Sequence, residues 1–238
     1  MQIFGHRGIP SLATENSLNS FEKILEYKVE GVEFDVHLTK DEELVVIHDF
    51  NTLKMSGEDY EISETNYETI NSLIIGDNEK IPLLSQVFDL LSDKVFYDIE
   101  VKSRGKNRSQ LCKKLLELIK KYNLEKNCMI SSFDPLIIKE FNKLNSGILT
   151  AVIYCNDKDV PFILRHGLGA LITKVDIIKP HYSQLKGFMF FILTKVFRKK
   201  CFVWTVNRQE DLDIAKKRGC FGVCSDNPQT LKQEGYKN

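Results

Sequence analysis

The sequence predicts a (β/α)₈ barrel, a closed ring of eight parallel strands with helices between them, within the α/β class. Its 238 residues fall near the length of about 250 that is typical of such barrels. Short runs rich in β-branched and aromatic residues also alternate with longer segments of helical periodicity, the pattern of βα units around a parallel sheet. We therefore expect one domain over residues 1–238, with a small insertion at 50–80 after the second strand.

The expected elements follow in order along the chain. In each helical segment apolar residues recur at spacings of three and four. The expected helices include 16–27, 84–91, 109–122 and 135–144. The expected strands are 2–5, 31–36, 95–101, 128–132, 148–153, 170–174, 201–206 and 221–225.

Two places break the alternation of strand and helix. The strand-like run 43–48 follows the second strand too soon for a crossover helix, so we expect it to pair back as a hairpin. That hairpin would deliver His48 to the mouth of the barrel. Residues 50–80 are polar and predict only a short helix near 66–73.

Charge and cysteine content bear on partners and compartment. The 33 basic and 33 acidic residues balance, so no broad basic surface indicates binding of nucleic acid.

A candidate catalytic histidine stands at position six, which leaves no room for a signal peptide, and we expect a cytoplasmic protein. The six cysteines lack metal-site spacing and predict buried, reduced thiols. They are Cys112, Cys128, Cys155, Cys201, Cys220 and Cys224.

The longest apolar stretch is 187–193, far shorter than the roughly 20 residues that span a bilayer. A basic flank at Lys195 and 198–200 allows a peripheral membrane contact. A barrel helix that packs its apolar side against the strands explains the same residues, and we favour that interpretation.

Acidic residues stand where the second and third expected strands end, the face that carries active sites in this fold. Glu33 and Asp35 are two apart, so both face one side of a strand while Phe34 faces the other. Glu100 would add a third carboxylate. Such a set suits one divalent cation, Mg²⁺ or Ca²⁺, better than zinc. The alternative is that the pair is exposed on an edge strand or bridged to Lys102.

Two histidines, His6 and His48, are candidates for proton transfer. Taken singly, a histidine at a strand end is more often a hydrogen-bonded structural residue. His37 alternates in phase with the acidic pair and is expected to support the site or the hairpin. His166 and His181 are expected to be incidental.

Taken together, the motifs resemble those of the glycerophosphodiester phosphodiesterase family over essentially the whole chain. One departure is Ser17, where the family usually has Thr; the hydroxyl is retained. The segments that carry the resemblance are His6-Arg7-Gly8, Glu15-Asn16-Ser17, 31–41, Val46-Ile47-His48-Asp49, 81–84, Ile99-Glu100-Val101-Lys102, Ser132-Phe133-Asp134-Pro135, 203–207 and Ser225-Asp226-Asn227-Pro228.

The resemblance implies a metal-dependent barrel enzyme that cleaves glycerophosphodiesters to sn-glycerol 3-phosphate and an alcohol. It implies Glu33, Asp35 and Glu100 as metal ligands. It also implies His6 and His48 as the acid/base pair that serves attack by the neighbouring glycerol hydroxyl.

The same resemblance implies that Arg7 and Lys102 contact the phosphate, where they would neutralise growing charge. Phe133 and Trp204 follow strands and could form an apolar wall beside the glycerol or the alcohol, with core packing as the competing role.

Three functions stay open at this point. The first is hydrolysis of deacylated phospholipid headgroups, and the second is the same chemistry on lysophospholipids, a lysophospholipase D activity. An apolar groove near 187–193 would favour the second. The third is a catalytically silent barrel that binds phosphate ligands. The headgroup, the choice of metal and the oligomeric state are not specified by the sequence.

Overall fold

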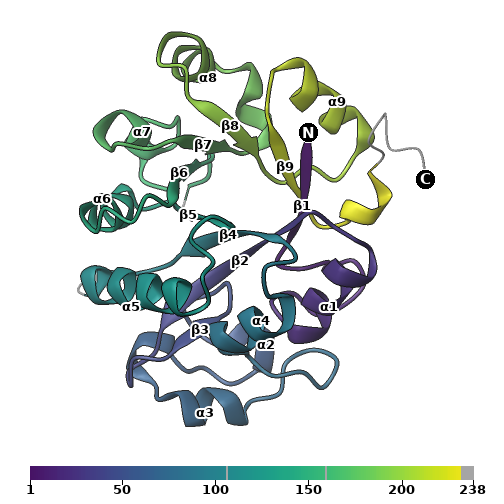
Figure 1. Cartoon of the computed structure of the whole chain (residues 1–238), viewed down its shortest axis with the longest axis vertical. Helices are drawn as coiled ribbons and strands as arrows, with labels where there is room; N and C mark the ends of the chain where they lie inside the picture. The colour runs from purple at the N-terminus through teal and green to yellow at the C-terminus, as the bar shows by residue number, and fades with distance from the viewer. Residues whose placement is uncertain (106, 159, 232–238) are drawn as a thin grey trace.

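The computed structural model describes residues 1–105, 107–158 and 160–231. Eight parallel strands close into a barrel, because β1 pairs with both β2 and β9, and helices surround them (Figure 1). The predicted (β/α)₈ fold is thereby confirmed. The strands are β1 (Gln2–His6), β2 (Gly31–Leu38), β4 (Phe96–Val101), β5 (Cys128–Ser132), β6 (Leu149–Tyr154), β7 (Ile177–Pro180), β8 (Lys200–Val203) and β9 (Gly222–Ser225).

The helices between the barrel strands vary in length. Two of the predicted ones begin at side-chain caps: the Ser17 hydroxyl accepts from the Ser20 amide at 3.1 Å, and the Asp134 carboxylate accepts from the Leu136 amide at 2.9 Å. Such caps satisfy amides that a helix start leaves unpaired. The helices are α1 (Leu18–Glu26), α4 (Leu84–Leu91), α5 (Arg108–Lys121), α6 (Pro135–Lys143), α7 (Gly169–Ile172), α8 (Phe188–Phe191) and α9 (Gln209–Lys217).

Alternation along β2 explains how the barrel places acidic residues. Val32, Phe34 and Val36 belong to the large apolar cluster that also includes helix residues. The intervening residues face the other way. In the parallel register Glu33 lies opposite Asp98, and Asp35 lies opposite Glu100. The pairing of β2 with β4 therefore gathers acidic side chains from two strands on one side.

The connection from β2 to β4 holds the predicted hairpin and insertion. β3 (Leu44–Val46) pairs antiparallel with β2, as expected for residues 43–48. The insertion contains α2 (Leu53–Ser56) and α3 (Tyr67–Ser72), the latter at the predicted helix near 66–73. It has an apolar cluster of its own, made by Val45, Ile47, Ile62, Ile70, Ile75 and Ile81. This cluster joins the insertion to the hairpin that carries His48.

The predicted strand at 170–174 is wrong. Those residues form α7 and the turn after it, and the barrel strand is β7 at 177–180. Its sequence, Ile-Ile-Lys-Pro, is short, charged and ends in proline, so the local pattern does not indicate a buried strand. The lysine is tolerated inside the barrel because an acidic residue on β4 pairs with it.

The apolar stretch 187–193 packs only in part. Phe190 and Leu193 are buried, whereas Phe188 and Phe191 are exposed. Within the described residues no helix is both long enough and apolar enough to cross a membrane. The six cysteines are unpaired thiols, and all except the half-buried Cys155 are buried, largely as expected.

Candidate active site

A cavity of about 350 Å³ lies at the carboxyl ends of the barrel strands. It is the expected location for the chemistry of this fold. Most of the residues singled out from the sequence line it, namely His6, Arg7, Glu33, His48, Glu100, Phe133 and Trp204. Asp35 and Lys102 contact these residues without lining the cavity itself.

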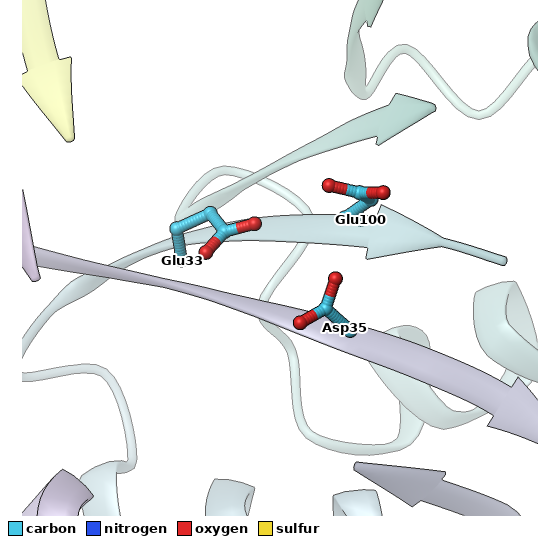
Figure 2. A group of neighbouring side chains, drawn as sticks. All are labelled: Glu33, Asp35 and Glu100. Atoms are coloured by element: carbon cyan, nitrogen blue, oxygen red, sulfur yellow. The ribbon is translucent and has the colours of Figure 1, made fainter. Parts of the chain in front are cut away.

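Three buried carboxylates, those of Glu33, Asp35 and Glu100, converge beside this cavity. One oxygen of each lies within 4.8 Å of the others. Figure 2 shows the first two on β2 and the third on the neighbouring strand, with their carboxylates grouped in one space. The side chains are 1–9% exposed, which excludes the alternative of exposed acids on an edge strand. The bridge to Lys102 does form: its Nζ lies 3.0 Å from Asp35 Oδ1 and 3.0 Å from Glu100 Oε1.

The buried negative charge of this cluster favours the binding of a cation. Burial and the nearby Asp35 raise the pKa of Glu33 to about 7, against the opposing effect of His6. Burial also acts to raise the pKa of Asp35, but Lys102 and Arg7 outweigh it and hold that pKa below its usual range. Buried Glu33 Oε2 has no hydrogen-bond partner among the described residues. A divalent cation with oxygen ligands would neutralise such a set of buried carboxylates.

His6, at the end of β1, is oriented by a residue far away in the sequence. Its Nδ1 lies 2.6 Å from Asp226 Oδ1, and Asn207 donates to the other oxygen of that carboxylate at 2.6 Å. The remaining nitrogen, Nε2, lies 3.8 Å from Glu33 Oε2. Burial acts to lower the pKa of His6, but Glu33 and Asp226 outweigh it and raise the pKa.

His48 has a similar arrangement at the end of the hairpin. Its Nδ1 lies 2.7 Å from Asp49 Oδ1. The backbone carbonyl of His48 accepts from His37 Nε2 at 3.3 Å. Burial and the Lys102 charge lower the pKa of His37 to about 4, so this ring is neutral and supports the hairpin, as expected. Each candidate histidine thus has a carboxylate on Nδ1, which fixes the tautomer and leaves Nε2 for chemistry.

Arg7 is placed by a tight turn after β1. Its own φ is +60° and that of Gly8 is +89°. A Cβ on Gly8 would lie 2.1 Å from Ser20 Oγ, so only glycine fits there. Arg7 Nη1 donates to Glu15 Oε1 at 3.0 Å, and its Nε lies 3.5 Å from Asp35 Oδ2.

Phe133 and Trp204 form an apolar side of the cavity. Their ring centroids are 5.5 Å apart in an edge-to-face arrangement. The Trp204 indole donates to the carbonyl of Lys179 at 3.0 Å, which fixes the ring. Ile153, Val160 and Pro161 continue the apolar lining. None of the residues 187–193 lines this cavity. These residues therefore do not support lysophospholipids as the substrate, as an apolar groove there would have done.

Sequence reasoning missed several residues that build the site. Asp226 and the pair Glu15 and Asn16 lie in the quoted motifs but had no assigned contact; Asn16 donates to Asp35 Oδ2 at 3.0 Å. Lys179 is buried, with its Nζ 2.5 Å from Asp98 Oδ2. The two-residue spacing of Asp98 and Glu100 could have predicted that both side chains face the same side of their strand. No sequence signal indicated Lys179, because the strand in that region was predicted at 170–174.

Comparisons with known proteins agree with this geometry. The model of the glycerophosphoryl diester phosphodiesterase family matches residues 6–230. A glycerophosphodiester phosphodiesterase of Caldanaerobacter subterraneus subsp. tengcongensis is 31% identical over 240 residues, covering 96% of this chain and 95% of that protein. A human lysophospholipase D is 25% identical, covering 95% of this chain and 83% of that protein.

A solved structure shares the fold. The Oleispira antarctica phosphodiesterase in complex with the product sn-glycerol-3-phosphate superposes with a TM-score of 0.83 at 22% identity, covering 97% of this chain and 95% of that one. The match of the family model to almost the whole chain is decisive. The chain belongs to the glycerophosphoryl diester phosphodiesterase family and is an enzyme that hydrolyses glycerophosphodiesters.

Proposed function

We propose that the enzyme cleaves deacylated phospholipid headgroups to sn-glycerol 3-phosphate and an alcohol, with His6 and His48 as its acid/base pair and one divalent cation, Mg²⁺ or Ca²⁺. One observation carries the proposal. Two histidines, each held at Nδ1 by a carboxylate, line the same cavity as Glu33 and Glu100 of the acidic cluster. The Oleispira antarctica relative, described with the product sn-glycerol-3-phosphate, supports the choice of substrate.

Glu33, Asp35 and Glu100 would hold the cation. When bound, it would act as a Lewis acid that neutralises charge on the phosphoryl oxygens. Lys102 contacts two of these carboxylates and keeps their charge balanced. Asn16 donates to Asp35 Oδ2, and Arg7 Nε lies 3.5 Å from the same oxygen; these contacts orient that carboxylate.

The histidines would move the protons. Nε2 of one ring takes the proton of the neighbouring glycerol hydroxyl as its oxygen attacks phosphorus, and the other ring protonates the departing alcohol oxygen. Water then opens the resulting cyclic phosphate, with the two roles exchanged. We assign the leaving-group proton to His48, because its side chain, 32% exposed, is nearer solvent than that of His6 at 15%.

Arg7 is proposed to contact the phosphate. Its guanidinium lines the cavity and is fixed from behind by Glu15. A fixed guanidinium can donate to two phosphate oxygens at once, whereas Lys102 would act as a point charge. Phe133 and Trp204 are proposed to cover the apolar side of the substrate.

A second candidate is hydrolysis of lysophospholipids. The cavity is mostly apolar toward Ile153, Val160 and Pro161. The next residues, Phe162 and Ile163, are 76% and 65% exposed. An acyl chain could follow this path from the cavity to solvent. The human relative is named a lysophospholipase D, which also supports this alternative.

The test is release of sn-glycerol 3-phosphate from a panel of glycerophosphodiesters and lysophospholipids, with chelator and with added Mg²⁺ or Ca²⁺. Chelator-sensitive release from the deacylated substrates is expected. Release confined to lysophospholipids would support the second candidate instead. Activity that a chelator leaves unchanged would contradict the metal-dependent mechanism.

The enzyme is further proposed to work in a reducing compartment, the cytoplasm. Its support is that all six cysteines are free thiols, as is usual for proteins of such compartments.

A further inference from the structure

A groove on the outside of the barrel combines exposed aromatic side chains with unpaired positive charge. The groove measures about 310 Å³ and lies between the α8 region and the end of α9, which are neighbours in Figure 1. It is lined by Leu185, Lys186, Gly187, Phe188, Phe190, Phe191, Thr194, Lys195, Lys217 and Arg218. These residues, together with exposed Val196 and Phe197, are called the basic aromatic surface below.

Three aromatic side chains of this surface are exposed to solvent. Phe188 is 77% exposed, Phe191 56% and Phe197 51%. Phe190 and Leu193 of the same segment are buried and hold it against the barrel. Packing on the barrel therefore accounts for one side of the segment and leaves the other in solvent. Exposed apolar patches rimmed by polar residues mark interaction sites.

The charge of the surface has one sign. Residues 185–200 contain five Lys and Arg residues and no Asp or Glu, in a chain whose total charge is zero. No lining residue of the groove is acidic. Among the described residues, Lys186, Lys195, Lys217 and Arg218 form no ion pair. Cations that line one groove together, with no carboxylate in that lining, favour an anionic partner.

We propose that the basic aromatic surface docks the enzyme on an anionic phospholipid bilayer. Aromatic side chains would enter the headgroup boundary, and the lysines and arginines would contact anionic headgroups, the combination that holds peripheral proteins on membranes. The proposal revises the sequence-based preference for a purely packed helix. It does not rest on the function proposed for the cavity.

The neighbouring segment extends this surface toward the cavity. Leu193 packs where a Cβ on Gly167 would come within 2.9 Å of it. The segment around Gly167 begins with Val160 and Pro161, which line the cavity, and continues with exposed Phe162 and Ile163. Docking through α8 would therefore bring a segment that borders the cavity close to the bilayer.

The experiment is co-sedimentation of the whole enzyme with vesicles of phosphatidylcholine alone and of phosphatidylcholine mixed with phosphatidylglycerol. Binding is expected only to the anionic vesicles and is expected to fall with added salt. A double variant, Lys195→Glu with Lys217→Glu, should weaken binding by on the order of 25-fold or more, since each basic residue near an anionic surface contributes about fivefold. Phe188→Ser should weaken it by about tenfold or more.

A matched control separates this surface from net charge. Lys113→Glu with Lys120→Glu makes the same charge change on exposed positions of α5 and should leave vesicle binding almost unchanged. Every variant should keep the thermal midpoint and the hydrolysis rate of the parent enzyme on water-soluble glycerophosphodiesters.

Two outcomes would overturn the proposal. One is equal vesicle binding by the Lys195/Lys217 and Lys113/Lys120 double variants. That result would show that binding depends on the overall charge of the enzyme and not on this surface. The other is no binding to anionic vesicles, together with a dimer in analytical ultracentrifugation that Phe188→Ser dissociates, which would assign the surface to a second copy of the chain.

Discussion

At the scale of single residues, the two candidate catalytic histidines have the same hydrogen-bonding arrangement. Each directs Nδ1 at a carboxylate, at 2.6 Å for His6 and 2.7 Å for His48. A carboxylate in this position fixes the tautomer and stabilises the imidazolium that forms after proton uptake. The remaining nitrogen of each ring is then available to the substrate.

His6→Ala and His48→Ala should each lower kcat by about a hundredfold or more, the scale of general acid/base catalysis. Steady-state release of sn-glycerol 3-phosphate measures the effect, and circular dichroism checks the fold. His166→Ala, outside the cavity, is the control and should retain full activity. Near-normal turnover in either of the first two variants would remove that histidine from the mechanism.

Asp226→Asn should change the pH profile as well as the rate. The Asp226 carboxylate contributes to the raised pKa of His6, so its loss lowers that pKa. The limb of the kcat/KM profile that reports His6 should therefore move to lower pH, with activity reduced by roughly tenfold to a hundredfold. Asp213→Asn, on the exposed side of α9, should leave the profile unchanged. An unmoved limb in Asp226→Asn would exclude this coupling.

Glu100→Gln should weaken metal binding by roughly tenfold or more, because it removes one charged oxygen ligand. Thermal unfolding during titration with Mg²⁺ or Ca²⁺ measures this without any assay of activity, since a ligand of the native state raises the midpoint. Glu42→Gln, an exposed carboxylate on a turn, serves as the control. An identical titration in Glu100→Gln would show that this residue is not a ligand.

At the scale of elements, the hairpin and insertion determine where His48 lies. β3 pairs with β2, and the six-residue apolar cluster of Val45, Ile47, Ile62, Ile70, Ile75 and Ile81 anchors the insertion to the hairpin. His37 on β2 donates to the backbone of His48. The position of His48 therefore depends on the stability of this small cluster.

Ile62→Ala should lower both stability and kcat. The side chain is 1% exposed, and such a truncation costs about 2–5 kcal/mol of unfolding free energy. Ile119→Ala makes an equal truncation at a fully buried position on α5. That control should lose stability but keep kcat. Equal kcat values for the two variants would contradict the coupling of the cluster to His48.

At the scale of the whole molecule, closure of the barrel brings distant strands into one polar interior. Lys179 on β7 pairs with Asp98 on β4 at 2.5 Å and donates to Ser131 on β5 at 3.1 Å. Both charged side chains are almost fully buried. Lys179 itself lines the cavity, so this network across β4, β5 and β7 supports one part of the cavity wall.

Lys179→Met should lower the free energy of unfolding by about 3–5 kcal/mol, because it leaves the Asp98 carboxylate buried without a cation. The double variant with Asp98→Leu should recover much of that loss. Urea unfolding of the single and double variants measures the interaction in a double-mutant cycle. Additive losses in the double variant would indicate that the two side chains act independently.

Much of the fold was predictable because local patterns agree with it. Seven of the eight parallel strands, the hairpin at 43–48 and helices such as α6 follow from alternation, spacing and caps that the chain carries locally. The strand at 177–180 was not predictable, because a lysine and a proline in a four-residue run contradict the usual composition of a buried strand. Only its partner Asp98, far away in the sequence, makes that lysine acceptable.

The sequence by itself determined the family, the barrel and the three acidic side chains that share one face, because residue spacing on a strand decides which side chains lie together. Tertiary structure alone decided that Asp226 orients His6 across 220 positions, that Lys179 lines the cavity, and that one side of α8 is left in solvent. These contacts depend on closure of the barrel, which joins its first strand to its last and has no local signature in the chain.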